Sequence, residues 1–186
     1  LKAVEAGVDG LVVEGGEGGG FKNPRDVSSM VLLPLICSQV NVPVIAAGGI
    51  TDGASMAAAF ALGAEAVQMG TRMVAAAESP VHENWKNAIV NAAETDTIFL
   101  NRFSRPAMRA MRTERTTRLE HEDNVSMMEF GTVTDLYFGG DMEASIALGG
   151  QVMGRITAVE PVATILERTM DEFHTIINQM HDQYGG

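Results

Sequence analysis

The sequence predicts an α/β fold in which parallel strands alternate with helices. Two short apolar runs, at 43–47 and 66–69, each end in glycine, at Gly48-Gly49 and at Gly70. Short runs of β-branched and small apolar residues are typical of strands buried on both faces, which occur mainly in parallel sheets. Apolar residues recur at helical spacing between the two runs, so the segment predicts a βα unit followed by a second strand.

The elements that precede this unit fit the same plan. Residues 1–7 are predicted to be the end of a helix that stops at Gly7, and residues 9–14 are predicted to form a buried strand. The largely apolar segment 28–40 predicts a helix, and Pro34 is expected to kink or divide it. Helix and strand therefore alternate from the start of the chain.

Two helical patterns and a short strand follow the second glycine end. The helices are predicted over 72–78 and 81–93, and the strand over 97–100. His82 lies near the start of the second helix, where a lone histidine more often caps or packs than catalyses.

A series of arginines recurs at helical spacing beyond residue 101: Arg102, Arg105, Arg109 and Arg112. Acidic residues, Asp123 among them, lie close by in the sequence, and such mixtures usually indicate a solvated, ion-paired face. The alternative is that these arginines bind an anionic carrier or the phosphate of a nicotinamide cofactor. Residues 124–140 follow no regular pattern, whereas a turn at 149–151 could reach a ligand.

The last element is a long amphipathic helix, predicted over 160–184. Its apolar residues form one stripe: Leu166, Met170, Phe173, Ile177 and Met180. A stripe of this kind usually docks a helix against the body of a protein.

Composition limits the partners and the compartment. The formal net charge of −11 at pH 7 argues against nucleic acid and against an anionic membrane surface. No apolar run approaches the roughly 18 residues of a membrane span. The single cysteine, Cys37, is expected to be a core residue and fits a reducing, cytoplasmic setting. No spacing of histidine, cysteine and carboxylate residues predicts a metal site.

A glycine-rich loop follows the first predicted strand, with glycine at every position of 15–20 except Glu17. So much glycine costs conformational entropy, which favours close backbone approach to a flat ligand, although a flexible connector remains the alternative. The loop is not a dinucleotide-binding G-x-G-x-x-G, because Phe21 stands where its last glycine belongs. It does not match a Walker A loop either.

The two strand ends at Gly48-Gly49 and Gly70-Thr71 predict a phosphate site. Glycine lets a ligand approach the backbone N–H groups, and the start of a following helix offers further unpaired donors. Ligands of α/β proteins bind where the carboxyl ends of parallel strands meet. Two such ends together therefore favour an anion site over two tight turns.

Several motifs occur in an order that resembles one family. They are the glycine-rich loop, A-A-G-G-I, A-E-A-V-Q-M-G-T-R, S-P-V-H-E-N-W-K, R-x-x-R-P-A-x-R and the terminal helix. The sequence resembles the nitronate monooxygenase family, once called 2-nitropropane dioxygenases, whose close relatives are flavin-dependent enoyl-ACP reductases. The resemblance covers nearly the whole chain, but only the second half of such a protein.

The resemblance implies the C-terminal half of a (β/α)8 TIM barrel, a partial barrel with a C-terminal helical segment. A complete barrel takes about 250 residues. We expect a single domain over 1–186, with βα units in 1–101 and a helical and irregular region in 102–186. The chain opens on Leu1 in what reads as the middle of a fold, so we expect it to be incomplete.

The resemblance also implies that FMN binds at the carboxyl ends of the strands. Carried over by position, the residues that would hold its phosphate and ribityl tail are Gly48, Gly49, Gln68, Met69, Gly70 and Thr71. Those that would contact the flavin from the preceding loop are Glu14, Gly18 and Gly19. In many members a histidine of this loop faces the substrate as acid or base. Phe21 occupies that position here and cannot move a proton, so no catalytic residue is assigned.

Several functions follow for a small-molecule substrate. The first is an FMN-dependent oxidoreductase that oxidises alkyl nitronates with O2, since anionic nitronates need no deprotonation. An alternative is reduction of an enoyl thioester or quinone with NAD(P)H as the reductant. Another is an inactive half-barrel that pairs with a further copy or chain through its exposed sheet edges. An enzyme similar to IMP dehydrogenase is disfavoured, because its nucleophilic cysteine needs a loop and Cys37 lies in a predicted helix.

Overall fold

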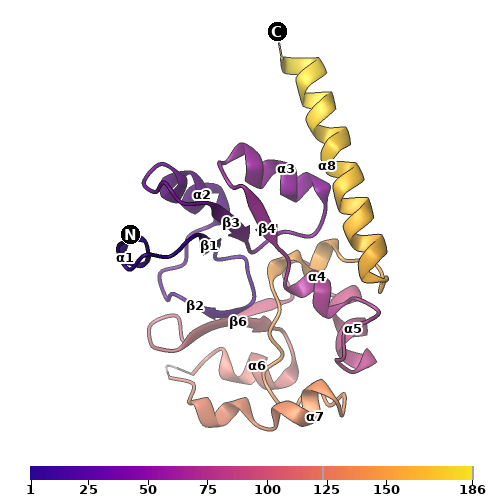
Figure 1. Ribbon diagram of the computed structural model, residues 1–186. Helices are drawn as coiled ribbons and strands as arrows, with labels where there is room; N and C mark the ends of the chain where they lie inside the picture. The colour runs from indigo at the N-terminus through magenta and orange to yellow at the C-terminus, as the bar shows by residue number, and fades with distance from the viewer. Residues whose placement is uncertain (123, 186) are drawn as a thin grey trace.

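A computed structural model describes residues 1–122 and 124–185 and contains two small sheets (Figure 1). The first sheet is parallel, in the order β1-β3-β4, with β1 at Leu11–Glu14, β3 at Val44–Ala47 and β4 at Ala66–Gln68. Its register pairs Leu11 with Val44 and Ile45 with Ala66. The parallel βα arrangement predicted from the sequence is therefore present.

Burial differs among the three parallel strands. The central strand β3 is the buried one, with Val44, Ala46 and Ala47 at most 4% exposed. The prediction that the outer strands are buried as well is wrong for the described residues: Val12 of β1 is 55% exposed and Gln68 of β4 is also exposed. The reason is their position, because each lies at an edge of the described sheet and has only one neighbour.

Helices α2 (Ser29–Cys37) and α3 (Gly53–Ala61) lie beside the parallel sheet, and Pro34 is inside α2 as expected. Leu33 of α2 is 1% exposed and belongs to the core that the sheet shares with these helices. The cysteine expected in that core, Cys37, is only partly buried and is the last residue of α2. Asp52 caps α3, because its carboxylate accepts a hydrogen bond of 2.9 Å from the backbone N–H of Ser55.

The second sheet is antiparallel, in the order β2-β6-β5, with β2 at Gly20–Lys22, β6 at Ala107–Met111 and β5 at Thr97–Leu100. The strand predicted over 97–100 is confirmed. The helix predicted for the arginines is wrong, since Arg109 lies on β6 and is 7% exposed. The solvated, ion-paired face is confirmed for Arg102 and Arg112, which are exposed and pair with Asp26 and Glu120. Every residue of β6 is buried, because strands pair with it on both sides. Asp123 lies outside the described residues.

The remaining short helices lie before, between and after the strands of the two sheets. They are α1 (Lys2–Glu5), α4 (Thr71–Val74), α5 (Glu83–Val90), α6 (Glu114–Leu119), α7 (Val133–Tyr137) and the 3₁₀ turns η1 (Met127–Phe130) and η2 (Gln151–Arg155). Helix α4 is shorter than the predicted helix 72–78, and 124–140 contains η1 and α7 where no pattern was found. The capping expectation for His82 is confirmed, because its ring accepts a hydrogen bond of 3.1 Å from the N–H of Asn84.

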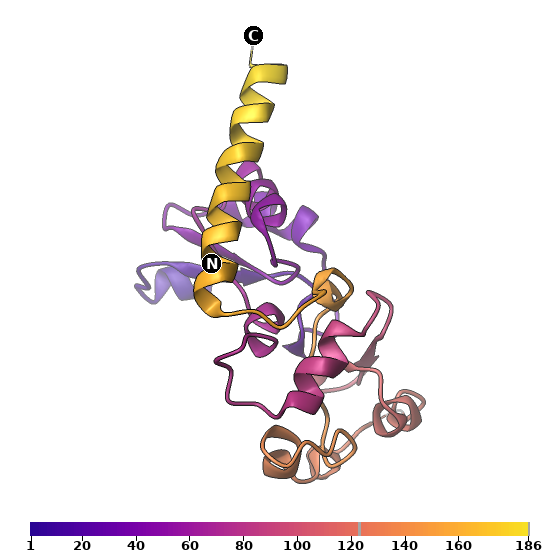
Figure 2. The same ribbon diagram turned by 90° about the vertical axis from the view of Figure 1, so that its right-hand side faces the viewer.

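The long helix α8 (Val162–Tyr184) begins near α4 and packs along α3, and its C-terminal end extends beyond the rest of the chain (Figures 1 and 2). It docks with Ile165 and Thr169, and Phe173 contacts the ring of Phe60 at 5.2 Å. Most of the predicted docking stripe is instead partly exposed, at 40–48% for Leu166, Met170, Ile177 and Met180. The contact face is thus rotated away from the stripe, and Gly53 permits the approach because a Cβ there would lie 2.3 Å from the backbone of α8.

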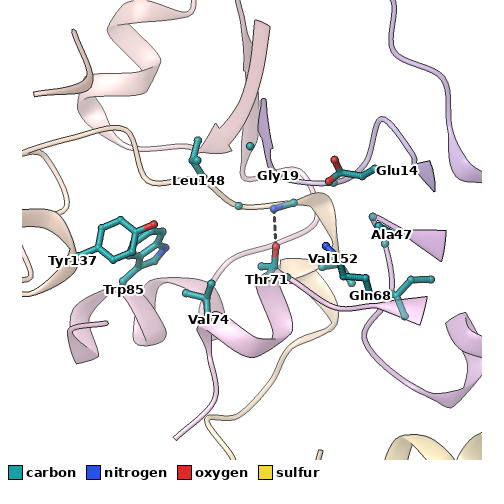
Figure 3. Close-up of a pocket in the computed structure, with 18 residues that line it drawn as sticks. Glu14, Gly19, Ala47, Gln68, Thr71, Val74, Trp85, Tyr137, Leu148 and Val152 are labelled. Carbon is teal, nitrogen blue, oxygen red and sulfur yellow. Dashed lines mark hydrogen bonds between the residues drawn. The ribbon is translucent and has the colours of Figure 1, made fainter. Parts of the chain in front are cut away.

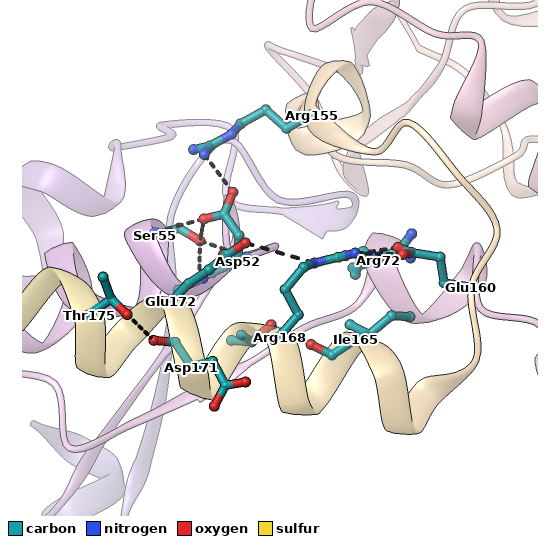
Figure 4. Close-up of polar contacts among 12 residues, drawn as sticks. Asp52, Ser55, Arg72, Arg155, Glu160, Ile165, Arg168, Asp171, Glu172 and Thr175 are labelled. Atoms are coloured by element: carbon teal, nitrogen blue, oxygen red, sulfur yellow. Dashed lines mark hydrogen bonds and ion pairs between the residues drawn. The ribbon is translucent and has the colours of Figure 1, made fainter.

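A network of ion pairs fastens α8 to the rest of the chain (Figure 4). Arg72 is 2% exposed and donates hydrogen bonds to the carbonyl of Ala158 at 3.1 Å and to Oε2 of Glu160 at 2.9 Å. Arg168 donates to both carboxylate oxygens of Glu160, at 2.5 and 2.8 Å. Its hydrogen bonds lower the pKa of Glu160 below the ordinary value and raise that of Arg168. None of the helices in the described residues is both long and apolar enough to cross a membrane.

Candidate functional site

A cavity of about 210 Å³ lies at the carboxyl ends of the parallel strands (Figure 3). We call it the glycine cavity. Backbone and side chains from β1, β3 and β4, the loop 15–20, the segment 148–152 and helices α4, α5 and α7 surround it. Its lining residues are Glu14, Gly18, Gly19, Gly20, Ala47, Gly48, Gly49, Ile50, Gln68, Gly70, Thr71, Val74, Trp85, Tyr137, Leu148, Gly149, Gly150 and Val152.

The glycine cavity gathers the residues that the resemblance singled out, with one exception. Glu14, Gly18 and Gly19 come from the glycine-rich loop and the strand before it. Gly48, Gly49, Gln68, Gly70 and Thr71 come from the ends of β3 and β4. Met69 does not line the cavity, because its partly buried side chain packs against the core of the parallel sheet.

Glycines after β3 are required by the backbone itself. Gly48 and Gly49 have φ of +81° and +76°, in the left-handed region that side chains disfavour. A Cβ on Gly48 would also lie 3.1 Å from the carbonyl oxygen of Gly15. This pair of residues therefore turns the chain sharply at the strand end, against the glycine-rich loop.

Gly70 is different, because neither its backbone nor its packing requires glycine. Its φ is −101°, which any residue adopts, and a Cβ added there would meet no atom within 4 Å. The missing side chain leaves room beside the cavity. In the described part of the chain, no acceptor is bonded by the backbone N–H groups of Gly48, Gly49, Gly70 or Thr71. Open space surrounded by unpaired donors is suited to an anion.

The glycine-rich loop and the segment 148–152 are packed backbone against backbone. A Cβ on Gly19 would lie 2.5 Å from the carbonyl carbon of Gly149, so only glycine allows this approach. The N–H of Gln151 donates to the carbonyl of Glu17 at 2.9 Å, and the N–H of Gly150 donates to Oγ1 of Thr71 at 3.1 Å. These bonds fix both segments around the cavity and confirm that the turn at 149–151 reaches its edge.

Arg109 is hydrogen-bonded to the glycine-rich loop. Its Nε donates to the carbonyl of Gly16 at 2.8 Å, and Nη1 donates to Oγ1 of Thr97 at 3.1 Å. Nη2 lies 3.6 Å from a carboxylate oxygen of Asp26. Burial lowers the pKa of Arg109, and the charge of Asp26 opposes that shift. Arginine remains charged at neutral pH all the same. The sequence pattern did not reveal this role, because the burial of β6 depends on distant strands.

Glu14 and Lys22 form an ion pair at the end of β1. Nζ of Lys22 lies 2.6 Å from Oε1 of Glu14, and the lysine side chain is only 5% exposed. Glu14 lines the glycine cavity, so Lys22 compensates a carboxylate that would otherwise repel an anion bound there. Phe21 on β2, beside Lys22, is 54% exposed, stacks on Phe130 at 5.9 Å and does not line the cavity.

The other end of the glycine cavity is apolar and aromatic. Val74, Leu148 and Val152 contribute aliphatic surface there, and the rings of Trp85 and Tyr137 meet edge to face at 4.7 Å. The sequence placed Trp85 only as an apolar residue of a helix, and residues around Tyr137 had no assigned element. Among the described residues, no group of three or more metal-ligating side chains is placed to hold a metal ion.

A mixed α/β chain with a donor-lined cavity at the ends of its parallel strands is a typical framework for phosphate-bearing ligands. Residues 1–172 match the family described as nitronate monooxygenase, and the chain belongs to that family. The family is related to flavin-dependent enoyl-ACP reductases.

Individual relatives agree. A protein described as "Probable nitronate monooxygenase" from Staphylococcus aureus strain Newman is 31% identical over 194 residues, which cover 93% of this chain and 53% of that protein. The chain thus spans about half the length of the curated relatives it matches.

Solved structures give the same picture. FabK from Thermotoga maritima superposes with a TM-score of 0.89 at 37% identity, covering 98% of this chain and 60% of that one. Nitroalkane oxidase from Streptomyces ansochromogenes superposes with a TM-score of 0.77 at 26% identity, covering 96% and 56%.

Proposed function

We propose that this chain forms one wall of the flavin site of an FMN-dependent oxidoreductase that oxidises alkyl nitronates with O2. The observation that carries the proposal is the set of unpaired backbone N–H groups around the space that Gly70 leaves open. Membership of the nitronate monooxygenase family and the likeness to nitroalkane oxidase support this reaction class.

The residues of the glycine cavity suit a flavin nucleotide. We propose that Gly48, Gly49, Gly70 and Thr71 hold its phosphate through their backbone N–H groups. Gln68 and the backbone of Met69 would hold the ribityl tail. Glu14, Gly18 and Gly19 would contact the flavin. A cavity of about 210 Å³ is smaller than the roughly 300–1,000 Å³ of sites that enclose a whole ligand, so part of the nucleotide would lie outside it.

The chain's own residues bind and orient in this proposal. The bound flavin supplies the electron-transfer chemistry, whereas the protein supplies position and electrostatics. Lys22 neutralises Glu14, and Arg109 keeps the loop 15–20 in place. Phe21 cannot accept a proton, so the proposed substrate is an already anionic nitronate and not a neutral nitroalkane.

We also propose that the chain is the C-terminal half of a (β/α)8 barrel, a single domain over 1–186 divided at residue 101. The exposed Val12 on the edge strand β1 supports this, because an apolar edge strand usually has a partner. A further strand or a second copy of the chain could supply that partner. The half-buried free thiol of Cys37 fits a reducing compartment such as the cytoplasm.

A second candidate is an NAD(P)H-dependent flavin reductase that acts on an enoyl thioester or quinone. Two observations favour it: Phe21 replaces the acid or base of the first reaction, and FabK matches at higher identity than nitroalkane oxidase does. The third candidate, an inactive half-barrel, rests on the exposed edge strands alone.

The visible absorption spectrum of the protein reconstituted with FMN tests the first proposal. We expect retained, protein-bound FMN after gel filtration; a colourless protein would contradict it and favour the inactive half-barrel. Anaerobic mixing then separates the two reactions. Bleaching of the flavin by an alkyl nitronate but not by NADH supports nitronate oxidation, whereas rapid bleaching by NADH supports the reductase.

A further inference from the structure

An open cavity of about 480 Å³ lies against the antiparallel sheet, outside the glycine cavity. It is lined by Phe21 and Lys22 of β2, by residues 23–24 that follow, and by the segment 105–107 at the start of β6. We call it the Arg105 pocket. None of the described residues that line it is acidic, and none of them lines the glycine cavity. The pocket is therefore a separate place, without a carboxylate that would repel an anion.

Arg105 differs from the other arginines of its segment because it has no acidic partner. Each of the others forms an ion pair: Arg102, Arg109, Arg112, Arg115 and Arg118. Among the described residues, Arg105 makes no ion pair and no side-chain hydrogen bond, and it is exposed. Lys22, the other cation of the pocket, is already paired with Glu14. The guanidinium of Arg105 is thus the uncompensated charge of the pocket, and its fork of N–H donors suits a phosphate.

The pocket also contains an exposed aromatic ring that is held in place. Phe21 is 54% exposed, and Phe130 stacks on it with 5.9 Å between ring centroids and 28° between ring planes. Phe130 does not line the pocket, so it supports the ring from the other side. Beside the ring, Oδ1 of Asn23 accepts the backbone N–H of Arg25 at 3.0 Å. The amide NH₂ of Asn23 remains available as a donor.

These groups together fit a ligand that has both an anion and a flat ring. Nucleotides combine the two, because bases stack on aromatic side chains and phosphate oxygens accept hydrogen bonds from arginine. A simple anion would use Arg105 alone, and an apolar ligand would use Phe21 alone. The volume of about 480 Å³ lies within the roughly 300–1,000 Å³ of small-molecule sites.

We propose that the Arg105 pocket binds a nucleotide, with the base stacked on Phe21 and a phosphate bonded to Arg105. The inference does not rest on the flavin proposal, because it uses no group of the glycine cavity. The nucleotide is a second ligand of the chain. It is either a nucleotide unit of the nicotinamide cofactor that the reductase candidate requires, or a free nucleotide.

Calorimetric titration with AMP and with adenosine tests the phosphate contact. We expect AMP to bind, and Arg105→Gln to lower its affinity about tenfold, with adenosine affinity unchanged. Thermal unfolding should not change, because Arg105 has no partner to lose. Arg118→Gln is the matched control: its side chain is 66% exposed, lies outside the pocket and should leave AMP affinity within about twofold. Absence of AMP binding, or equal AMP affinity in Arg105→Gln, overturns the inference.

A second substitution tests the stacking of the base. Phe21→Leu keeps an apolar side chain but removes the ring, so we expect about tenfold weaker binding of both AMP and adenosine. Phe103→Leu is the control, because Phe103 is 95% exposed, lies two residues from Arg105 and does not line the pocket. It should change neither affinity. AMP and adenosine affinities that Phe21→Leu leaves unchanged would contradict the stacked base.

Gly70→Val separates this inference from the proposed function. It should leave AMP affinity within about twofold, because Gly70 lines only the glycine cavity of the two. AMP binding that is lost in Gly70→Val but kept in Arg105→Gln would place the AMP phosphate in the glycine cavity and overturn the inference. If FMN does not bind but AMP binding responds to Arg105→Gln, only the flavin proposal fails. Displacement of AMP by NADH would identify the nicotinamide cofactor as the source of the nucleotide, and no displacement would identify a free nucleotide.

Discussion

Two cavities of nearly equal volume lie close together in this chain but are lined by opposite chemistry. The glycine cavity, about 210 Å³, is surrounded by backbone, apolar side chains and unpaired N–H groups (Figure 3). The second, about 200 Å³, lies between α8, α4 and the start of α3, and its charged side chains bond to one another (Figure 4). We call it the charged cavity; its ionised residues are Asp52, Arg72, Arg155, Glu160, Arg168 and Glu172.

The two cavities differ in whether their polar groups already have partners. In the charged cavity Arg155 pairs with Asp52 at 2.5 Å, and Arg72 and Arg168 share Glu160, so the charges are already compensated. A ligand would have to break those pairs. In the glycine cavity the backbone N–H groups have no hydrogen bonds to break, and a ligand would supply their acceptors. Charge density alone would favour the charged cavity, whereas the unpaired donors support our proposal that the ligand binds in the glycine cavity.

The largest expected effect concerns the support of the glycine cavity. Arg109→Met removes a buried cation and leaves the carbonyl of Gly16 without its donor, so we expect a loss of about 4 kcal/mol in the free energy of unfolding. Urea denaturation measures it. Arg102→Met is the control, because Arg102 also contacts Asp26 and Phe99 but its side chain is 48% exposed. A loss above about 1 kcal/mol there would contradict the account, since exposed pairs contribute less.

The charged cavity is expected to affect stability without affecting the ligand. Glu160→Gln removes the negative partner of the buried Arg72, and we expect a loss of about 3 kcal/mol in the free energy of unfolding with unchanged FMN affinity. Denaturation and calorimetric titration together check this. Glu167→Gln, at an exposed position on α8, should change neither quantity. A weakened FMN affinity in Glu160→Gln would show that the two cavities are coupled.

The same carboxylate gives a pH dependence with a definite sign. Arg168 lowers the pKa of Glu160 in the folded chain, so Glu160 contributes stability above its unfolded-state pKa, which is about 4.3 for an ordinary glutamate. This contribution is lost as pH falls through the lower, folded pKa. The stability difference between the unmodified protein and Glu160→Gln should therefore be constant from pH 7 to about 5.5 and shrink below about pH 4. A difference that grows on acidification would contradict the assignment.

A side chain at Gly70 should weaken FMN binding and leave stability unchanged, which is the reverse of the effect expected for Glu160→Gln. Gly70→Val fills the open space beside the unpaired donors, and we expect about 100-fold weaker FMN binding, equivalent to about 2.7 kcal/mol. Thermal unfolding of the ligand-free protein should hardly change, because the added Cβ meets no atom within 4 Å. Gly70→Ala is expected to show a smaller loss of affinity. Normal FMN binding by Gly70→Val would place the ligand elsewhere.

The smallest expected effect lies outside both cavities. His82→Ala removes the side chain that accepts from the N–H of Asn84 at the start of α5, so we expect a loss of about 1 kcal/mol in the free energy of unfolding. The helix carries Trp85, but its packing in the core should keep that ring in place. FMN affinity should therefore stay within about twofold, as measured by fluorescence titration.

Features determined by neighbouring residues in the sequence could be predicted. The positive φ of Gly48 and Gly49 explains why glycines end β3, and the position of His82 just before a helical pattern explains its capping role. The order of the motifs was sufficient to identify the family, and residues 1–172 match it. The grouping of the two glycine ends into one cavity followed because parallel strands place their carboxyl ends at one edge of a sheet.

Features determined by distant segments could not be predicted. Arg109 belongs to a helical spacing in the sequence, but pairing with β2 and β5 makes its segment a buried strand. The docking face of α8 was misjudged because Gly53 of α3 decides which residues can approach. Trp85 and Tyr137 come together across 52 positions of sequence, from 85 to 137, and no local pattern relates them.

A crystal structure of the FMN complex would show where the phosphate binds. We expect the phosphate oxygens to lie within about 3.2 Å of the backbone nitrogens of Gly48, Gly49, Gly70 and Thr71, with the pairs of the charged cavity unchanged. A phosphate bound in the charged cavity, or FMN bound away from Gly70, would contradict this expectation.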